Sequence, residues 1–320
     1  MTAVDTTVGR NFMEIRLIVN PHAGGGAARR KTAQLAEYFQ RAGARCTVAE
    51  TERPGHATQL ARQAQIDGVF RLVVVGGDGT LNEVVQVYVD ENGAPAVGPE
   101  LALVPAGTGG DFCRAFGLDA DPAKAVARIM AAIPRPLDLA LARLVGHDGR
   151  PITRAFANVG SFGISGSVAR MTNQGGKWLG GRLAFYSATT RATLGYQNAP
   201  VHIVLDGESF YRGKAYLVAA ANAGYFGGGM NIAPTALPTD GLLNCVLVGD
   251  VGRLEALAKT PLIYKGKHLS LAKVKSKTFR HMRAEPWLTG DDVYVELDGE
   301  TPGKLPLEIQ VLEGAVQLCV

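Results

Sequence analysis

The stretch RLVVVGGDGTLNEVV, residues 71–85, decides the fold. Its opening run, 71–75, is mostly apolar and predicts a strand, and its last residues predict a helix. Between them lies the turn GGDGT, 76–80. Thr80 and Glu83 have the spacing of a capping box, so we expect the helix to begin at Thr80. The stretch therefore predicts a strand, a glycine-rich turn and a helix, the unit from which parallel sheets are built.

The turn carries a carboxylate at its centre. Glycine-rich turns between a strand and a helix bind phosphate, because their backbone N–H groups and the helix N-terminus point at the anion. Asp78 would repel a phosphate unless a cation lay between them. We therefore expect a divalent metal, Mg²⁺ that arrives with a nucleoside triphosphate. For an isolated Asp-Gly pair, an Asp that only hydrogen-bonds its own turn would be the simpler interpretation.

Two further glycine-rich loops show that the turn is not isolated. The stretch VNPHAGGG, 19–26, places Asn20 and three glycines ahead of a helix expected from Ala27. The stretch VPAGTGGDFCRAFG, 104–117, contains a second carboxylate, Asp111. Neither has the P-loop spacing G-x-x-x-x-G-K-[ST] or the dinucleotide spacing G-x-G-x-x-G. Three such loops at equivalent ends of parallel strands, two of them with an Asp, indicate a binding site.

The first 140 residues alternate between strand-like and helix-like segments. We expect strands at 15–20, 45–50, 71–75 and 101–105, each followed by a glycine-rich loop and an alanine-rich helical segment. Strands joined by single helices form right-handed βαβ units and a parallel sheet. In such sheets ligands bind beyond the carboxyl ends of the strands, where these loops are expected. Residues 14–140 are therefore predicted to be a nucleotide-binding α/β domain.

The pattern changes after PRPLDLALARL, 134–144. Most later segments have the pattern of strands joined by turns of Gly, Asp and Pro, whereas 164–196 and 252–264 are helix-like. We therefore expect a mainly antiparallel β domain over residues 141–320. Residues 1–13 contain neither an apolar core nor a cleavage pattern and are expected to be a short polar tail.

Composition argues against several classes of protein. The 320 residues have a formal net charge of +4 and show no motif of RNA or DNA binding, so we expect no nucleic-acid partner. No run of about 18 uncharged apolar residues exists, which argues against a bilayer-spanning helix. The four cysteines and six histidines lack metal-binding spacing, so a zinc site is not expected. Together with the polar start, these features predict a cytoplasmic protein.

Three motifs occur in order along the chain: N-P-x-x-G, then G-G-D-G-T-x-N-E, then P-x-G-T-x-x-D-F. This ordered set resembles the bacterial soluble diacylglycerol kinase family. The resemblance continues through FANVGSFGISGSVA (156–169), PTALPTDGLLNCVLV (234–248) and VELDGE (295–300), so it covers nearly the whole chain. These lipid kinases are related to sphingosine and ceramide kinases. The resemblance implies a Rossmann-like parallel sheet, similar to those of phosphofructokinase and NAD kinase, followed by an antiparallel β-sandwich that receives the lipid.

The resemblance also implies ATP and Mg²⁺ as cofactors and the residues that hold them. The implied ATP site comprises Asn20, Pro21, His22, Ala23, Gly24, Thr51, Gly76, Gly77, Asp78, Gly79, Thr80, Leu81, Asn82 and Thr108. Asp240, with the backbone carbonyls of Leu237 and Leu242, matches a Mg²⁺ site of the family. Asp78, Asp111 and Asp138 match acidic residues that hold the catalytic Mg²⁺ through water.

Glu300, at the end of LDGE, matches the family's general base, and Asp298 two residues upstream is the alternative candidate. Without the resemblance, LDGE would be interpreted as a hairpin turn. The stretch TDGLL, 239–243, would be interpreted as a turn followed by a strand. The chain departs from the family at Gly110, where relatives usually have Asn, so a side-chain contact that positions nucleotide or acceptor is missing there.

A basic segment lies outside these motifs, because no acidic residue occurs between Lys259 and Arg283. Lys273, Lys275 and Lys277 fall on one face of a predicted strand. One interpretation is a solvated edge strand protected against aggregation. The other is peripheral contact with an anionic membrane surface, to which each basic residue contributes on the order of 1 kcal/mol.

The expected function is transfer of the γ-phosphoryl group of ATP to the hydroxyl of a membrane lipid, with diacylglycerol as the leading acceptor. Phosphatidylglycerol or a sphingoid base is the alternative acceptor, and NAD is disfavoured because PAGTGGDF, 105–112, is not the pattern of NAD kinases. A module that senses nucleotide without transfer is a further alternative. We expect the protein in the cytoplasm and transiently at the inner membrane surface, and a homodimer is left open.

Overall fold

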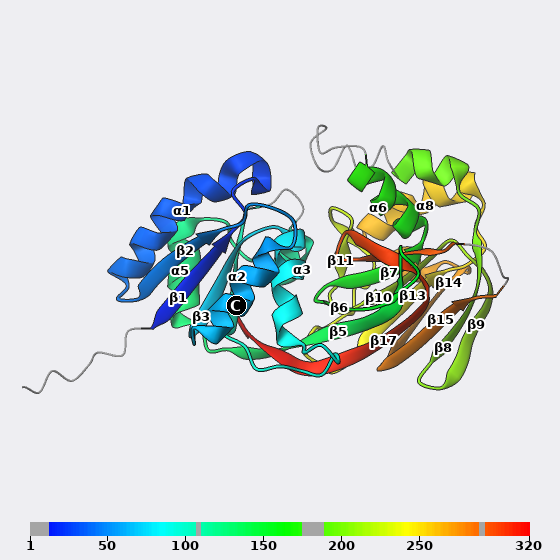
Figure 1. Ribbon diagram of the computed structural model, residues 1–320. Coiled ribbons are helices and arrows are strands. Elements are labelled where there is room, and N and C mark those ends of the chain that lie inside the picture. The colour runs from blue at the N-terminus through cyan, green and yellow to red at the C-terminus, as the bar shows by residue number, and fades with distance from the viewer. Residues whose placement is uncertain (1–12, 107–109, 175–188, 288–291) are drawn as a thin grey trace, which may run out of the picture.

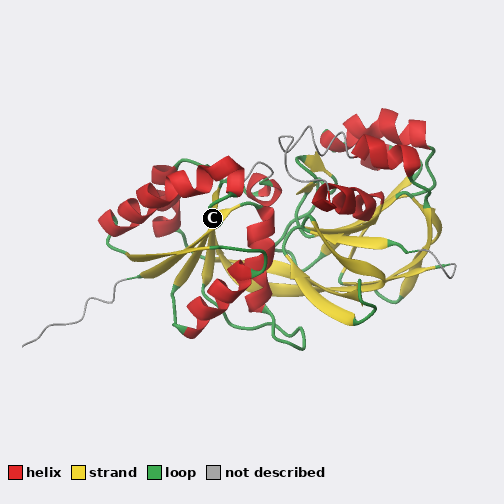
Figure 2. Cartoon of the chain, turned by 45° about the horizontal axis from the view of Figure 1, so that its top comes forward, coloured by secondary structure: helices red, strands yellow, loops and turns green. Residues whose placement is uncertain are grey.

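The computed structural model describes residues 13–106, 110–174, 189–287 and 292–320. It has two lobes (Figure 1). In the first lobe helices lie on both sides of a sheet, and the second consists mainly of strands (Figure 2). We refer to these lobes as the α/β domain and the β domain, and they confirm the predicted fold class.

The α/β domain contains four parallel strands in the order β2-β1-β3-β4. They are β1 (Glu14–Val19), β2 (Arg45–Glu50), β3 (Arg71–Gly76) and β4 (Glu100–Pro105). Their ends agree with the predicted strands to within one residue. Because β2 and β3 flank β1 on opposite sides, the loops that follow β1 and β3 diverge. They leave a crevice at the carboxyl edge of the sheet, which is where α/β proteins bind ligands.

Helices cover both faces of this sheet. On one face lie α1 (Ala23–Arg41) and α5 (Pro122–Ala131), and on the other lie α2 (His56–Ile66), α3 (Asp78–Val85) and the 3-10 helix η1 (Gln86–Tyr88). Val73 and Val75 of β3 join the core beneath α1, whereas Leu72 and Val74 join the core beneath α2 and α3. Burial on both faces explains why β3 is apolar almost throughout.

The predicted capping box is wrong. Helix α3 begins at Asp78 rather than Thr80, and its N-cap residue Gly77 makes no side-chain hydrogen bond. The carboxylate of Glu83 instead accepts a hydrogen bond from the backbone N–H of Ala57 at the start of α2, 2.9 Å away. The spacing of a capping box is a local signal. Here the Glu83 carboxylate binds a neighbouring helix and not the N-terminus of its own helix.

The β domain is a sandwich in which all described strand pairs are antiparallel. Its strands are β5 (Arg135–Gly146), β6 (Pro151–Phe156), β7 (Val159–Gly163), β8 (Ala199–Leu205), β9 (Glu208–Ala215), β10 (Leu217–Ala221), β11 (Tyr225–Phe226), β12 (Met230–Asn231), β13 (Leu243–Val248), β14 (Val274–Phe279), β15 (His281–Pro286), β16 (Tyr294–Leu297) and β17 (Glu300–Cys319). One apolar core, with members such as Val218 and Ile309, fills the space between the layers. The long strand β17 takes part in both layers, pairing with β16 and then with β5 and β15.

Helices cover the outer face of the layer that contains β7, β10 and β13. They are α6 (Ile164–Gln174), α8 (Arg253–Tyr264), the 3-10 helix η2 (His268–Ser270) and a helical segment at 189–195. The predicted helices at 164–196 and 252–264 are confirmed where the structure describes them, and 175–188 lie outside the described residues. Among the described helices, none combines the length and the apolar character needed to cross a membrane.

The last strand ties the two domains together. Leu318 and Cys319, at the end of β17, pair in parallel with β4 of the α/β domain. Arg128 of α5 donates hydrogen bonds to the carbonyl oxygens of Cys319 and Leu103, at 3.0 and 2.7 Å. The end of the chain was predicted as a strand, but its partner in the other domain was not. The predicted boundary at residue 140 falls inside β5.

Helix α6 lies very close to β16. A Cβ atom on Gly166 of α6 would be 2.1 Å from the carbonyl oxygen of Tyr294, a backbone atom that has little freedom to move. Only glycine permits this approach. The close contact fixes α6 against the strand that leads into the LDGE turn.

We expect Gly166→Ala to lower the free energy of unfolding by about 1–3 kcal/mol, because the added methyl overpacks the contact between α6 and β16. Gly195→Ala is the matched control, since a Cβ there would meet no atom within 4 Å. Urea unfolding of both variants, followed by circular dichroism, measures the difference. Equal stability of the two variants would contradict the close approach.

Candidate active site

The loop that follows β1 is bound to its neighbours through Asn20. Its backbone N–H donates to the carbonyl of Val75 on β3 at 3.1 Å, and its side-chain amide donates to the hydroxyl of Thr80 at 3.3 Å. The Asn20 carboxamide oxygen accepts the backbone N–H of His22 at 3.1 Å. The motif N-P-x-x-G thus uses its Asn to join the first and third loops.

Three consecutive glycines follow in left-handed conformation, Gly24 at φ +59°, Gly25 at +63° and Gly26 at +85°. Helix α1 becomes regular only after them, which agrees with the helix expected from Ala27. A Cβ on Gly24 would lie 2.0 Å from the carbonyl oxygen of Ala106, so the first loop lies directly against the loop that follows β4. Successive N–H groups in such a conformation form an anion-binding concavity.

The other implied ATP residues border the same loops. Thr51 follows β2, and its N–H donates to the carbonyl of Val19 at 2.8 Å. Leu81 is buried in the core beneath α3, so a contact from it to a nucleotide would come from the backbone. Thr108 lies outside the described residues. The structure therefore brings the described members of the predicted set to one edge of the sheet.

Asp78 answers the question raised by its place in a glycine-rich turn. Its two carboxylate oxygens accept the backbone N–H groups of Asp111 and Phe112, at 3.0 and 3.2 Å. These are the first residues of the short helix α4 (Asp111–Ala115). Asp78 therefore holds the loop after β4 against the loop after β3, and a carboxylate at a helix N-terminus is electrostatically favourable.

Asp111 is buried beside it, with 4% of its surface exposed. Its Oδ2 accepts the N–H of Gly228 at 2.7 Å, from the turn between β11 and β12. Burial, together with the charge of Asp78, raises the pKa of Asp111 to about 6. Its Oδ1 has no hydrogen-bond donor among the described residues, but the Nε of Arg114 lies 3.8 Å from it.

Two asparagines that the sequence motifs did not single out lie at the same junction. Asn158, from FANVG, donates to the carbonyl of Tyr225 at 2.7 Å, and Asn222, from AANAG, donates to the carbonyls of Asp138 and Ala157 at 2.7 and 2.8 Å. The carboxamide oxygens of both are buried without a donor among the described residues. The Asn in each short glycine-containing stretch is the signal that could have identified them.

The oxygen atoms left over at this junction fit a hydrated cation. Buried acceptors nearly always have a donor, and here Oδ1 of Asp111, Asn158 and Asn222 have none in the described structure. Carboxylate and carboxamide oxygens are the ligand types that Mg²⁺ and its bound waters prefer. These oxygen atoms have the chemistry that the predicted role of Asp111 requires, and its contact with Mg²⁺ through water stays a prediction.

Asp138 is used differently from Asp111. It is almost completely buried, and its two oxygens accept the N–H groups of Gly241 and Gly314, at 2.7 and 2.8 Å. Its own N–H donates to the carbonyl of Pro238 at 2.9 Å. Asp138 therefore holds the 237–242 loop in place, and its water-mediated contact with the catalytic Mg²⁺ stays a prediction.

The 237–242 loop carries the second predicted metal site. Asp240 is exposed, and its Oδ1 accepts the N–H of Leu242 at 3.0 Å, which forms an Asx turn. Gly241 has φ +70°, and Leu237 is 58% exposed. One carboxylate and two backbone carbonyls on a single tight loop are hard oxygen donors of the kind that bind Mg²⁺.

The LDGE stretch is a two-residue hairpin between β16 and β17. Its central residues Asp298 and Gly299 have φ +49° and +94°, which is the type I′ turn that Asp-Gly favours. Oδ1 of Asp298 accepts the N–H groups of Asn158 and Val159, at 3.1 and 2.9 Å. Its Oδ2 accepts the N–H of Ala157 at 2.9 Å and the side-chain amide of Asn82 of α3 at 3.3 Å.

Asp298 is therefore a clamp between the two domains. Its four donors come from the turn before β7 and from helix α3 of the α/β domain. Burial raises its pKa to about 6 despite those hydrogen bonds. An oxygen atom that is already bound by two donors is poorly placed to accept a further proton, which disfavours Asp298 as the alternative base.

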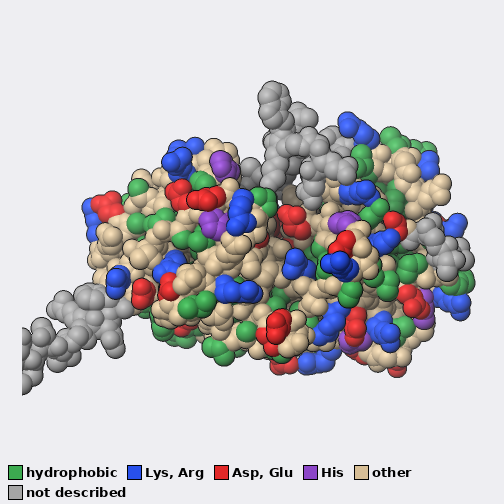
Figure 3. Space-filling view, viewed as in Figure 1, with side chains coloured by type: hydrophobic (Ala, Val, Ile, Leu, Met, Phe, Trp, Pro, Cys, Tyr) green, Lys and Arg blue, Asp and Glu red, His purple; other side chains and the backbone are tan. Residues whose placement is uncertain are grey.

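Glu300 faces the glycine-rich loop of the α/β domain. Its side chain is exposed, and a Cβ on Gly79 would lie 3.9 Å from its Oε1. The hairpin thus brings the predicted base across the domain boundary to the turn that contains Asp78. In the space-filling view an acidic side chain is visible at the wall of the hollow between the lobes (Figure 3).

Behind the hairpin lies Glu296, a fully buried acid that the motifs did not identify. Its carboxylate accepts hydrogen bonds from the hydroxyl of Ser161 and from the N–H of Gly299. Burial raises its pKa to about 7, and the charges of Asp298 and Glu300 add to the shift. Glu296 lies between Val295 and Leu297 on β16. Because side chains alternate between the two faces of a strand, a polar residue between two apolar ones is expected on the surface.

Gly110, the position that departs from the family, has φ +58° and immediately precedes α4. This left-handed conformation is adopted most readily by glycine and next by Asn. A Cβ there would be 4.0 Å from that of Cys113, so the position has room for a side chain. Asn in relatives and Gly here therefore satisfy the same backbone requirement.

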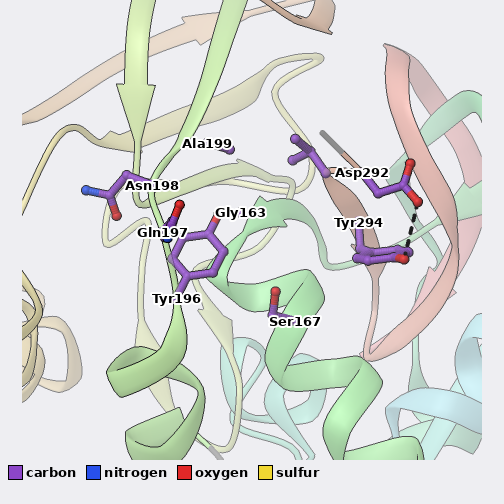
Figure 4. A pocket seen from close by; sticks show the side chains of 9 residues that line it. Gly163, Ser167, Tyr196, Gln197, Asn198, Ala199, Asp292 and Tyr294 are labelled. Atoms are coloured by element: carbon purple, nitrogen blue, oxygen red, sulfur yellow. Dashed lines mark hydrogen bonds between the residues drawn. The ribbon is translucent and has the colours of Figure 1, made fainter. Parts of the chain in front are cut away.

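A separate pocket of about 160 Å³ lies in the β domain beside α6 (Figure 4). Its lining includes Ser167, Tyr196, Asn198, Asp292 and Tyr294. The Tyr294 hydroxyl is 3.5 Å from an oxygen of Asp292. None of the residues predicted for the site lines this pocket, which is at the opposite end of β16 from the LDGE turn.

We expect Glu296 to make the free energy of unfolding depend on pH. Its pKa in the folded state, about 7, is above the ordinary value of 4.5, so its contribution is fully present below pH 4.5 and is lost as pH rises through 7. Glu296→Gln keeps an acceptor for Gly299 and removes the charge. Urea unfolding at pH 5.5 and 8 should show a smaller loss of stability in the variant, by roughly 2 kcal/mol. Exposed Glu50→Gln is the control, and parallel pH dependences of all three proteins would contradict the assignment.

Comparison with known proteins places these features in a family. Residues 14–142 match the diacylglycerol kinase catalytic domain, and residues 158–320 match the YegS C-terminal NAD kinase beta sandwich-like domain. A Xanthomonas euvesicatoria protein named "Probable lipid kinase YegS-like" is 33% identical over 267 residues, 82% of each chain. A diacylglycerol kinase of Mycobacterium tuberculosis is 28% identical over 306 residues, 95% of this chain and 94% of the relative. A solved structure of a candidate diacylglycerol kinase from Bacillus anthracis has a TM-score of 0.75 at 26% identity and covers 96% of this chain and 97% of that one.

Proposed function

The chain belongs to the bacterial diacylglycerol kinase family of lipid kinases, and we propose that it transfers the γ-phosphoryl group of ATP to the hydroxyl of diacylglycerol, giving phosphatidic acid. One observation carries the proposal more than any other. The hairpin of the β domain brings the carboxylate of Glu300 against Gly79, in the glycine-rich loop at the crevice of the α/β domain. A base and a phosphate-binding loop thus meet across the domain boundary.

ATP as the donor is supported by the loops at the carboxyl edge of the sheet. The three left-handed glycines Gly24–Gly26 and the start of α3 offer backbone N–H groups to an anion. The loops are joined to one another through Asn20 and Asp78, so this site is already formed without a ligand. Phosphoryl transfer depends mainly on positioning and charge neutralisation, which preformed loops supply.

Asp78 and Asp111 would hold Mg²⁺ through water, and Asp240 with the carbonyls of Leu237 and Leu242 would hold a second ion. When bound, Mg²⁺ neutralises charge on the phosphate oxygens. The residues of the chain itself then have three tasks. The loops orient the triphosphate, Asp298 joins the two domains, and Glu300 Oε1 or Oε2 accepts the proton of the acceptor hydroxyl. The hydroxyl oxygen bonds to the γ-phosphorus while the bond from that phosphorus to the β,γ-bridging oxygen breaks, and ADP leaves.

Diacylglycerol is placed first among acceptors because the family model and the Mycobacterium tuberculosis relative are described by that activity. The Xanthomonas relative is described only as a lipid kinase, so phosphatidylglycerol and sphingoid bases remain the alternatives. NAD is the least favoured acceptor. A module that senses nucleotide without transfer is disfavoured, because Asp111 and Glu300 are both retained at the crevice.

We expect phosphate from ATP to be transferred to diacylglycerol in mixed micelles in preference to the other acceptors. The measurement is incorporation of radiolabelled phosphate with a panel of diacylglycerol, phosphatidylglycerol, sphingosine and NAD. Omission of Mg²⁺ should abolish incorporation, because Mg²⁺ neutralises the charge on the phosphate oxygens during transfer. Preferential labelling of another lipid would replace diacylglycerol as the acceptor, and binding of ATP without transfer to any acceptor would leave only the sensing module.

We expect Glu300→Gln to lower turnover by about 10²–10⁴-fold, the usual contribution of a positioned base, while ATP affinity stays nearly the same. Glu308→Gln, on the same strand but paired with His281, is the control for loss of one negative charge. Calorimetry measures ATP binding, and lipid phosphorylation measures turnover. Loss of ATP binding in step with activity, or full activity in Glu300→Gln, would show that Glu300 is not the base.

Asp298→Asn distinguishes the clamp from the base. At least one of its three backbone hydrogen bonds must be lost, because the Asn amide nitrogen would face a backbone N–H donor at either oxygen position. The variant should therefore unfold at lower urea concentration than Glu300→Gln, which removes no interdomain hydrogen bond of Asp298.

A further inference from the structure

Helix α8 carries apolar side chains on its outer face. Leu254 is 80% exposed, and Ala258, Pro261 and Lys265 are exposed at spacings of four, three and four residues, so they lie on one face of the helix. Ala256, on the inner face, is buried against the sandwich. A surface helix of a water-soluble protein ordinarily turns polar residues outward, and three of these four outward positions are apolar.

The helical segment 189–195 extends this apolar surface. Leu194 is 52% exposed. The segment lies beside the start of α8, because Arg253 donates to the carbonyl of Tyr196 at 3.3 Å and Asn198 donates to the carbonyl of Val251 at 2.9 Å. In Figure 1 both helices lie at the same upper edge of the molecule as the start of α1.

Basic side chains surround the apolar ones. The exposed ones are Arg191, Arg253, Lys265 and Lys267. Within the described part of the chain, no carboxylate lies within ion-pair distance of any of these four. Glu255 is the only acidic residue between 251 and 281, and it is already bound by Lys259 and Lys273, at 2.7 and 2.8 Å. Hydrophobic and basic side chains are both visible over this end of the β domain (Figure 3).

The lysines predicted to contact a membrane are less suited to it. Lys273 pairs with Glu255, and Lys277 pairs with Glu208 at 3.1 Å. Lys275 lies over the ring of Tyr211 at 5.6 Å. Lys273 lies in the turn just before β14 rather than on the predicted strand, two of the three lysines are opposed by carboxylates, and no large apolar side chain is exposed on β14.

We propose that the outer face of α8 and segment 189–195 docks on the surface of an anionic bilayer. This surface, the α8 face, comprises Leu194, Leu254, Ala258 and Pro261 with Arg191, Arg253, Lys265 and Lys267. Apolar side chains enter the headgroup boundary while the surrounding basic residues contact anionic headgroups. The inference rests on the proposed function, since a kinase whose acceptor is a membrane lipid reaches it at such a surface.

The size of the apolar area favours a bilayer over a second copy of the chain. Residues 254–261 of a helix span about 10 Å, and a stable dimer needs roughly 800 Å² from each partner. Three exposed positions and Leu194 offer much less. A bilayer requires no such area, because electrostatic attraction to many headgroups adds to the insertion of a few apolar side chains.

The test is sedimentation of the full-length protein with vesicles of phosphatidylcholine, with and without phosphatidylglycerol. The double variant Leu194→Asp/Leu254→Asp and the double variant Lys265→Glu/Lys267→Glu should each bind the anionic vesicles about tenfold less tightly or weaker still. The second should also make the residual binding less sensitive to salt. Ile133→Asp and Val97→Asp, at 83% and 93% exposed positions of the α/β domain, are the controls and should bind like the parent.

Two further measurements separate the possible failures. The first is phosphorylation of a short-chain diacylglycerol dissolved as monomers, which should be the same in the parent and in both double variants. If the parent does not phosphorylate it, the proposed acceptor is contradicted, and the docking proposal is not affected. Unchanged binding of the folded double variants to anionic vesicles would overturn the α8 face. A dimer in the parent that Leu254→Asp converts to a monomer, with vesicle binding unaltered, would assign the face to a second copy instead.

Discussion

The carboxylate of Asp298 joins the turn that carries the predicted base to both domains. Asp298 accepts four hydrogen bonds, three from the backbone at residues 157–159 and one from the side chain of Asn82. The type I′ turn that orients it also directs Glu300 at the glycine-rich loop, so the clamp and the predicted base are set by the same two-residue hairpin. Asp298 and Glu300 are separated only by Gly299, so a movement of one of them would also move the other. The preference of Asp-Gly for a type I′ turn therefore determines where Asp298 and Glu300 lie at the crevice.

Several acids are buried together around this crevice, although burial disfavours their charged forms. The pKa values of Asp111, Glu296 and Asp298 are all raised, to about 6, 7 and 6, with desolvation as the largest cause in each. Such a cluster costs stability at neutral pH, and its retention is typical of a functional site. The charge of Asp78 adds to the shift at Asp111, but Asp78 also has a structural role, since it caps α4 and fixes the loop from which Asp111 projects. The carboxylate in the glycine-rich turn is thus both a tertiary anchor and a candidate partner of a hydrated metal.

The sequence predicted most of the fold because its signals are periodic. The strands of the parallel sheet were predicted to within one residue, since two-sided burial makes them short apolar runs between glycine-rich loops. Roles that depend on a distant partner were missed or mistaken. Glu83 has the spacing of a capping box but binds another helix, and the two backbone N–H groups that Asp138 accepts from the 237–242 loop and Gly314 were not predicted. The pairing of β17 with β4 was not predictable either, because a strand pattern does not specify which edge it joins.

The β domain also connects the proposed bilayer contact to the predicted base. Helices α6 and α8 pack on the same outer face of the sandwich, and α6 touches β16 so closely that only Gly166 fits. Strand β16 then leads directly into the turn of Asp298 and Glu300. The α8 face and Glu300 are both attached to this sheet, so the distance between them is fixed. Docking of the α8 face would therefore set the height of Glu300 above the bilayer. Any opening of the crevice must then move the α/β domain away from the β domain and break the hydrogen bonds that cross this boundary, from Asn82 to Asp298, from Gly228 to Asp111 and from Ala155 to Gln86.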